Sequence, residues 1–122
     1  MLAGIDHVQL AAPAGCEEEA RRFFGLLLGL EEIEKPAALR ARGGAWFRIG
    51  TQQLHVGVDE GFAPARKAHP AFGVHDYEGL LIRLREAGVM VTDDESFPGV
   101  DRSYLHDPWG NRIELVALNR DA

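Results

Sequence analysis

The sequence predicts an α+β fold in which one β–α–β–β–β module occurs twice, as a curved mixed sheet around a shared cavity with helices on the outer face. Two observations predict it. There are two amphipathic helical segments, and each follows one apolar strand and precedes three more. We therefore predict a single domain, with a first module at 1–58, a linker at 59–68 and a second module at 69–122.

Both helices show apolar residues at helical spacing. In the first, three glutamates occupy the first turn, where the helix dipole favours negative charge, and Gly29 is a stop signal. In the second, Asp76 is a plausible N-cap and Gly88 a plausible end. The apolar positions are Ala20, Phe23, Phe24, Leu27 and Leu28 in the first helix, and Tyr77, Leu80, Leu81, Leu84 and Ala87 in the second.

The strands are predicted from runs of apolar residues that end at turn residues. The second module contains a tight turn over 107–111, which is rich in residues that tolerate such geometry. Segments 35–44 and 93–101 are predicted loops. The predicted strands are 5–12, 31–34, 45–49 and 53–58 in the first module, and 69–75, 89–91, 102–106 and 112–118 in the second.

The composition limits the function. Hydrophobic residues make up 46% and charged residues 26%, which is ordinary for a globular domain. A net charge of −6 argues against nucleic-acid binding, and no apolar run is long enough to span a membrane. The single cysteine, Cys16, excludes an internal disulfide, and no secretion signal is evident. We expect a cytoplasmic protein that acts on a small molecule.

Alternation along the strands sorts side chains between the helix face and the inner face, because residues i and i+2 share a face. Four residues of metal-ligand type fall on the inner face: His7, His55, His69 and Glu114. Each alone is more simply a surface or hydrogen-bonded residue. Together, in two repeats, they would be costly to bury without a partner, so we predict a divalent metal ion, with Zn, Ni, Mn, Fe and Co all suited to these donors.

The sequence resembles the vicinal oxygen chelate superfamily, which includes glyoxalase I, extradiol dioxygenases, fosfomycin-resistance transferases and bleomycin-resistance proteins. The resemblance spans nearly the whole chain. Its most specific part is the turn and strand Asp-Pro-Trp-Gly-Asn-Arg-Ile-Glu-Leu, which joins the turn to a ligand at a fixed offset. The resembling segments are 5–10, 23–30, 69–74 and 107–115.

The resemblance implies that His7, His69 and Glu114 are metal ligands. It also implies a homodimer, often with a metal site built from both chains. Where glyoxalase I-like members have a glutamate, this sequence has His55. That departure leaves three reactions open: a glyoxalase I-like isomerisation, an extradiol dioxygenation and a fosfomycin thiol transfer.

The leading hypothesis is a metal-dependent enzyme, such as a glyoxalase-like lyase or a dioxygenase, that chelates a small substrate through two adjacent oxygens. Glu114 or His55 would move the proton. Gln9, Trp46, Arg48 and Tyr104 face the predicted cavity as substrate-binding residues, with Arg48 as a partner for a substrate carboxylate. His75 and His106 are expected at the surface. The alternative is a non-catalytic protein that sequesters a drug or other ligand, as bleomycin-resistance proteins do.

Overall fold

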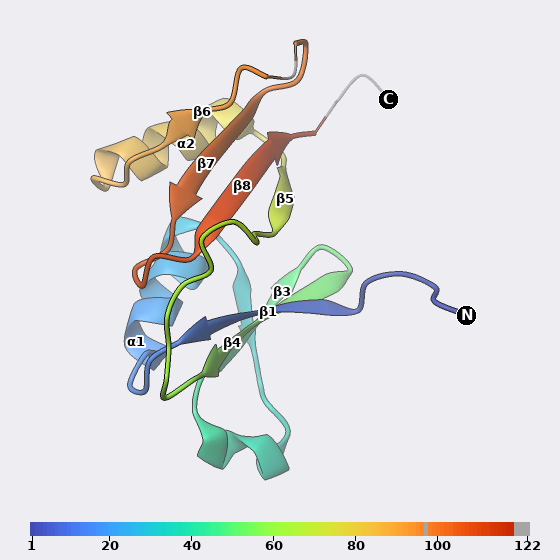
Figure 1. Ribbon diagram of the computed structural model, residues 1–122, viewed down its shortest axis with the longest axis vertical. Helices are drawn as coiled ribbons and strands as arrows, with labels where there is room; N and C mark the ends of the chain where they lie inside the picture. Colours follow the sequence, from blue (N-terminus) through green and yellow to red (C-terminus); the bar gives the residue numbers. More distant parts are fainter. Residues whose placement is uncertain (97, 119–122) are drawn as a thin grey trace. The chain divides into compact units, whose positions relative to one another are not determined.

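A computed structural model of the chain describes residues 1–96 and 98–118. It separates into two compact units, unit 1 over Met1–Pro64 and unit 2 from Ala65 onward. Each unit contains one strand, one helix and three further strands, so the predicted α+β fold with two β–α–β–β–β modules is confirmed (Figure 1). No helix in the described residues is long and apolar enough to cross a membrane.

Unit 1 contains a four-stranded sheet in the order β1-β4-β3-β2. The first and last strands of the module, β1 and β4, pair in parallel, and the other pairs are antiparallel. The elements are β1 (His7–Ala12), α1 (Glu17–Ala20), a π-helical stretch (Arg21–Leu27), β2 (Glu31–Ile33), a 3₁₀ helix (Ala37–Arg42), β3 (Ala45–Ile49) and β4 (Gln52–Val58).

The helical segment of unit 1 packs as predicted but winds differently. Phe23 and Phe24 are buried, and the Phe24 ring lies 5.9 Å from the ring of Phe47 on β3. After Ala20 the backbone turns are wider than in an α-helix, and Leu28 N donates to Phe23 O five residues earlier. The apolar spacing predicts a helix but does not distinguish these two windings.

The sheet faces of unit 1 alternate as predicted. Leu10, Phe47, Leu54 and Val56 are buried on the helix face, and the residues between them face the other way. Cys16 is also buried in this unit, and burial is the main reason that the pKa of its thiol is raised. It is a small core residue rather than a reactive thiolate.

Unit 2 repeats the topology, with its sheet in the order β5-β8-β7-β6 and with β5 and β8 parallel. The elements are β5 (Ala71–Val74), α2 (Tyr77–Glu86), β6 (Thr92–Asp93), β7 (Arg102–His106) and β8 (Arg112–Ala117). Asp76 caps α2 by accepting a hydrogen bond from Gly79 N, as predicted. The core is formed by Leu81, Leu84, Leu105, Ile113 and Leu115.

Three segments differ from the sequence prediction. The short strand predicted at 89–91 instead lies at Thr92–Asp93, where it pairs with Tyr104 and Ser103. The predicted loop at 35–44 contains the 3₁₀ helix Ala37–Arg42. The strand predicted at 69–75 begins only at Ala71, so His69 lies in the segment before it. For the two strands, pairing with a neighbouring strand rather than local composition decides the boundary.

The turn between β7 and β8 is held by a buried carboxylate. Asp107 Oδ1 accepts hydrogen bonds from Trp109 N at 3.0 Å and Asn111 N at 2.8 Å, and its Oδ2 accepts from Asn111 Nδ2 at 2.8 Å. Burial is the largest influence on Asp107 and raises the pKa of that carboxyl. The turn fixes where β8 begins, and hence the position of Glu114 on its inner face.

Candidate functional site

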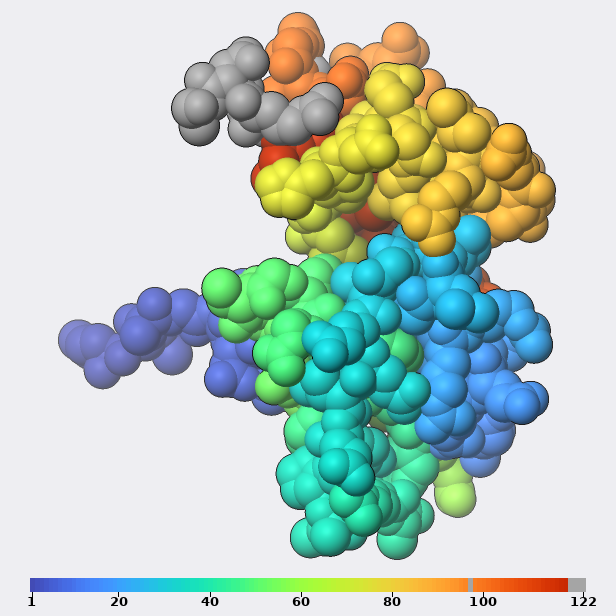
Figure 2. Space-filling view, turned by 180° about the vertical axis from the view of Figure 1, so that it is seen from behind, coloured from blue at the N-terminus to red at the C-terminus, as the bar shows by residue number. Residues whose placement is uncertain are grey.

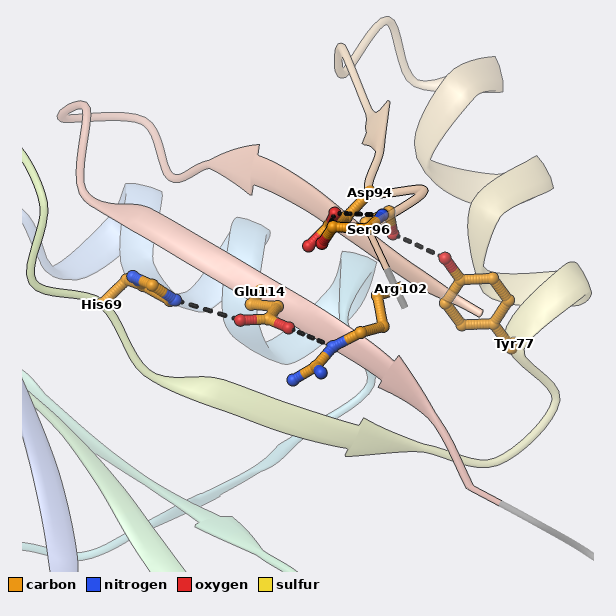
Figure 3. A network of polar contacts seen from close by, with 7 residues as sticks. His69, Tyr77, Asp94, Ser96, Arg102 and Glu114 are labelled. Atoms are coloured by element: carbon orange, nitrogen blue, oxygen red, sulfur yellow. Dashed lines mark hydrogen bonds and ion pairs between the residues drawn. The ribbon is translucent and has the colours of Figure 1, made fainter. Parts of the chain in front are cut away.

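The inner face of unit 2 carries a buried carboxylate between a histidine and an arginine. Glu114, on β8, is only 4% exposed. Its Oε1 lies 3.0 Å from His69 Nε2, and its Oε2 accepts a hydrogen bond from Arg102 Nε at 2.5 Å. Figure 3 shows His69 and Arg102 flanking Glu114 from opposite ends. Burial is the largest single influence on Glu114 and raises its pKa, but these two hydrogen bonds together bring the pKa below its usual range.

His69 contacts two acceptors at once. Its Nδ1 lies 2.8 Å from the carbonyl oxygen of Lys67, and its Nε2 faces the Glu114 carboxylate. A neutral imidazole has one N–H and can donate to only one of these oxygens. The arrangement therefore needs either a second ring proton or a cation between Nε2 and the carboxylate.

This pair fits a divalent metal ion. Imidazole nitrogen and carboxylate oxygen are both donor types for such ions. A carbonyl that accepts from Nδ1 is also the contact that orients a ligating histidine through Nε2. Arg102 Nε donates to Oε2 of Glu114, and Oε1 is the atom that faces the imidazole.

Tyr104 completes this face of unit 2. It is the cross-strand partner of Glu114, and its ring lies edge-on to the His69 ring at 5.5 Å. The Arg112 guanidinium lies over the Tyr104 ring, 4.1 Å from its centre. The tyrosine therefore forms a wall beside the histidine and the carboxylate.

The inner face of unit 1 carries a stack of three rings. His55, on β4, is buried between Trp46 and His7, with ring centres 3.7 Å and 4.3 Å away. His55 Nε2 lies 2.8 Å from Gln53 Oε1. Burial, and next the neighbouring His7, lower the pKa of His55, so its ring is neutral at pH 7.

The stack limits how these two histidines can bind an ion. The rings of His7 and His55 lie within 20° of parallel, and the lone pair of an imidazole nitrogen lies in the plane of its ring. Two nearly parallel stacked rings, with centres 4.3 Å apart, do not direct two in-plane lone pairs at one ion. His7 Nδ1 lies 2.9 Å from Asp6 Oδ1, a contact that leaves Nε2 as the atom for a ligand.

A cavity of about 200 Å³ opens beside this stack, within unit 1. Gln9 and Trp46, both predicted to bind substrate, line it. Arg48 does not. Its Nε lies 3.2 Å from Glu31 Oε1 on the neighbouring strand. The remaining lining residues are Lys35, Leu39, Arg42, Gly43, Val56, Gly57 and Val58.

The predicted site residues thus form two clusters. His69, Glu114 and Tyr104 lie together in unit 2, and His7, His55, Trp46 and Gln9 share a face in unit 1. Across residues 1–96 and 98–118, no three His, Cys, Asp or Glu side chains form a group that could hold a metal ion. His75 and His106 are exposed, as expected.

Sequence reasoning missed three side chains. Arg102 pairs with Glu114 twelve residues later, and nothing local in the sequence indicates that contact. Lys35 and Arg42 lie in a segment predicted as a loop, and only its 3₁₀ turn brings them to the cavity. A basic residue at each end of a short loop between two strands is the one signal that could have suggested them.

Comparison with known proteins places the chain in a family. The profile of the Glyoxalase/Bleomycin resistance protein/Dioxygenase superfamily matches residues 4–115. A Bacillus anthracis protein described as glyoxalase family is 50% identical, with a TM-score of 0.94 over 98% of each chain. A search of curated proteins found no match.

More distant structures share the fold. A lactoylglutathione lyase from Agrobacterium tumefaciens is 22% identical, with a TM-score of 0.72 over 95% of this chain and 94% of that chain. The fosfomycin resistance protein FosX from Listeria monocytogenes is 18% identical, with a TM-score of 0.76 over 99% and 98%. The chain belongs to the Glyoxalase/Bleomycin resistance protein/Dioxygenase superfamily.

Proposed function

We propose that this protein is a divalent-metal-dependent enzyme that acts on a small substrate held through two adjacent oxygens. The observation that carries the proposal is the contact of His69 Nε2 with Glu114 Oε1, made while Nδ1 lies against the carbonyl oxygen of Lys67. His69 and Glu114 would hold a divalent ion, which would satisfy both groups without a second ring proton. Glu114 is buried, so a compensating cation stabilises it more than it would a solvated carboxylate.

His7 is the proposed third ligand. Its Nδ1 contact with Asp6 leaves Nε2 available. His7 lies two residues before the partner of His55, and His69 lies two residues before the partner of Glu114. His7 belongs to unit 1 and the other two proposed ligands to unit 2. Membership of the superfamily supports a homodimer as the proposed assembly.

The roles of the remaining residues follow from their contacts. A bound divalent ion polarises substrate oxygens and stabilises the negative charge that develops on them. Arg102 holds Glu114 ionised and fixes its orientation. His55, neutral between two rings, has Nδ1 as its unprotonated nitrogen when Nε2 donates to Gln53 and is the proposed proton acceptor. Trp46 and Tyr104 provide aromatic walls.

One observation favours a second candidate, a protein that sequesters a ligand without changing it. The stack of Trp46, His55 and His7 beside a cavity is a flat aromatic surface that can hold a planar ligand with no metal. The metal titration described next separates the two candidates.

The test is a titration of chelator-treated protein with Zn²⁺, Mn²⁺, Ni²⁺, Fe²⁺ and Co²⁺ by calorimetry. We expect saturable binding of at least one ion, weakened about 100-fold or more in His69→Ala and Glu114→Gln. His106→Ala is the matched control, because His106 is an exposed histidine on the neighbouring strand, and its affinity should equal that of the unmodified protein. Loaded protein is then screened with methylglyoxal–thiol adducts, catechols and fosfomycin, since lyase and fosfomycin-resistance proteins share the fold.

Two results would contradict the proposal. Absence of divalent binding would remove the metal-dependent enzyme and leave the sequestering protein. Equal metal affinity in Glu114→Gln and His106→Ala would show that the ion binds elsewhere.

A further inference from the structure

The cavity of unit 1 is built by the segment between β2 and β3. The 3₁₀ helix Ala37–Arg42 leaves the sheet and returns through two glycines with positive φ, Gly43 at 75° and Gly44 at 88°. A Cβ on Gly44 would lie 2.1 Å from the Val56 carbonyl oxygen, so only glycine allows this close return. In Figures 1 and 2 the segment, in teal, projects from one end of unit 1.

The lining of this cavity is positively charged. Lys35 and Arg42 line it, and no acidic side chain does. This is notable in a chain with a net charge of −6. The Lys35 ammonium donates to the carbonyl oxygen of Gly43, which anchors it at the cavity. Its charge also acts on the nearby Glu17 carboxylate, whose pKa is lowered mainly by the hydrogen bond from Gly44 N and further by Lys35.

The other arginines of unit 1 are all paired. Each of them contacts a glutamate in an exposed ion pair: Arg21 with Glu32, Arg22 with Glu19, Arg40 with Glu34 and Arg48 with Glu31. Within residues 1–96 and 98–118, Arg42 has no carboxylate partner of this kind. Glu17, the acidic residue nearest Gly43, accepts a hydrogen bond from Gly44 N at 2.6 Å and does not line the cavity.

The opposite wall of the cavity is aromatic and amide. Trp46 is held flat by its stack on His55, with an interplanar angle of 2°. The Gln9 side chain lies over Gly57, where a Cβ would come within 2.7 Å of the Gln9 amide nitrogen. Arg42 and Lys35 therefore line a small cavity together with a flat ring and an amide.

We propose that this cavity binds the carboxylate of a small organic acid, with Arg42 and Lys35 as its charge partners and Trp46 against its planar or apolar body. The guanidinium fork matches the two oxygens of a carboxylate. A volume of about 200 Å³ is below that of most drug-sized sites and corresponds to roughly seven water molecules of about 30 Å³ each. The claim that the cavity is part of the substrate site rests on the proposed function. The claim that it binds a carboxylate does not.

The test measures the binding of acetate, pyruvate and benzoate to the full-length, chelator-treated protein. Calorimetry gives the affinities, and amide chemical shifts in NMR locate the site. We expect saturable binding of at least one acid at millimolar concentration, with shifts centred on Trp46 and Gly43. Benzamide, the neutral counterpart of benzoate, should bind at least about tenfold more weakly. Arg42→Gln and Lys35→Gln should each weaken acid binding by about tenfold or more.

Arg40→Gln is the matched control. Arg40 lies in the same 3₁₀ helix, pairs with Glu34 outside the cavity and contacts Lys35 at its backbone carbonyl, at 3.3 Å, so its substitution should leave acid affinity unchanged. Circular dichroism would check that all three variants keep the fold. The proposal is overturned if none of the acids binds, if benzamide binds as well as benzoate, if Arg42→Gln matches Arg40→Gln, or if inorganic phosphate binds more tightly than every acid. Because no metal is present, these outcomes are independent of the metal titration.

Discussion

The two units place different chemistry at equivalent strand positions. In unit 1 the residue opposite both Gln9 and Trp46 is His55, and in unit 2 the residue opposite both Ala71 and Tyr104 is Glu114. The same register makes His7 correspond to His69. One unit therefore pairs an imidazole with an imidazole, and the other pairs an imidazole with a carboxylate.

The difference between His55 and Glu114 changes which contacts stabilise the inner face of each unit. In unit 1 the His55 ring stacks on His7 and on Trp46, and burial favours its uncharged form. A carboxylate cannot be stabilised by stacking, and in unit 2 it takes a hydrogen bond from Arg102 on the neighbouring strand. The position in unit 1 that corresponds to Arg102 is Gly44, which has no side chain and instead allows the return of the 3₁₀ segment. The same topology thus supports a charged pair in one unit and a cavity in the other.

Among the substitutions that test this comparison, Gly44→Ala should have the largest effect on stability. We expect Gly44→Ala to lower the free energy of unfolding by about 3 kcal/mol, because the new Cβ meets the Val56 carbonyl oxygen at a positive φ. Gly57→Ala is the control on the neighbouring strand. Its Cβ meets only the flexible Gln9 side chain, so the cost should be below about 1 kcal/mol. Urea unfolding of both variants measures the difference, and equal midpoints would show that the close return of the chain is not a constraint.

A smaller effect separates the two faces by pH. The pKa of His55 is lowered from its ordinary 6.5, so its contribution to stability is present above pH 6.5 and is lost as pH falls through the folded-state value. The pKa of Glu114 is lowered from its ordinary 4.5, so its contribution is present above pH 4.5 and is lost at more acidic pH. Acidification therefore lowers the free energy of unfolding through both groups, but in different pH ranges.

The variants His55→Gln and Glu114→Gln test this separation by urea unfolding across pH in the presence of a chelator. His55→Gln should reduce the change of unfolding free energy with pH in the window that begins at pH 6.5 and extends down to the folded-state pKa of His55. Glu114→Gln should reduce it only below pH 4.5. The pKa of Asp107 is raised by burial and acts in the opposite sense in the acid range, so the difference between each variant and the unmodified protein is the readout. If both variants changed the pH dependence of unfolding in the same pH range, the two inner faces would not titrate separately.

The sequence predicts most of the fold because the apolar spacing decides it. Phe47 and Leu54 on strands, and Leu81 and Leu84 on a helix, alternate or recur at the spacing of their elements and are buried as expected. Alternation also places His55 and Glu114 on the inner faces correctly. It cannot determine that the 3₁₀ helix brings Lys35 and Arg42 to one cavity, or that Arg48 pairs with Glu31, because those contacts depend on how non-adjacent segments return to the sheet.

The central claim is that the imidazole–carboxylate pair of unit 2 binds the metal and that His55 of unit 1 does not. The most direct measurement is a long-range proton–nitrogen NMR spectrum of the imidazole rings, recorded as Zn²⁺ is added to chelator-treated protein. The account predicts that His69 Nε2 moves to the shift of a metal-bound nitrogen, while both nitrogens of His55 and those of exposed His75 keep their shifts. A shift at His55 with none at His69 would contradict it.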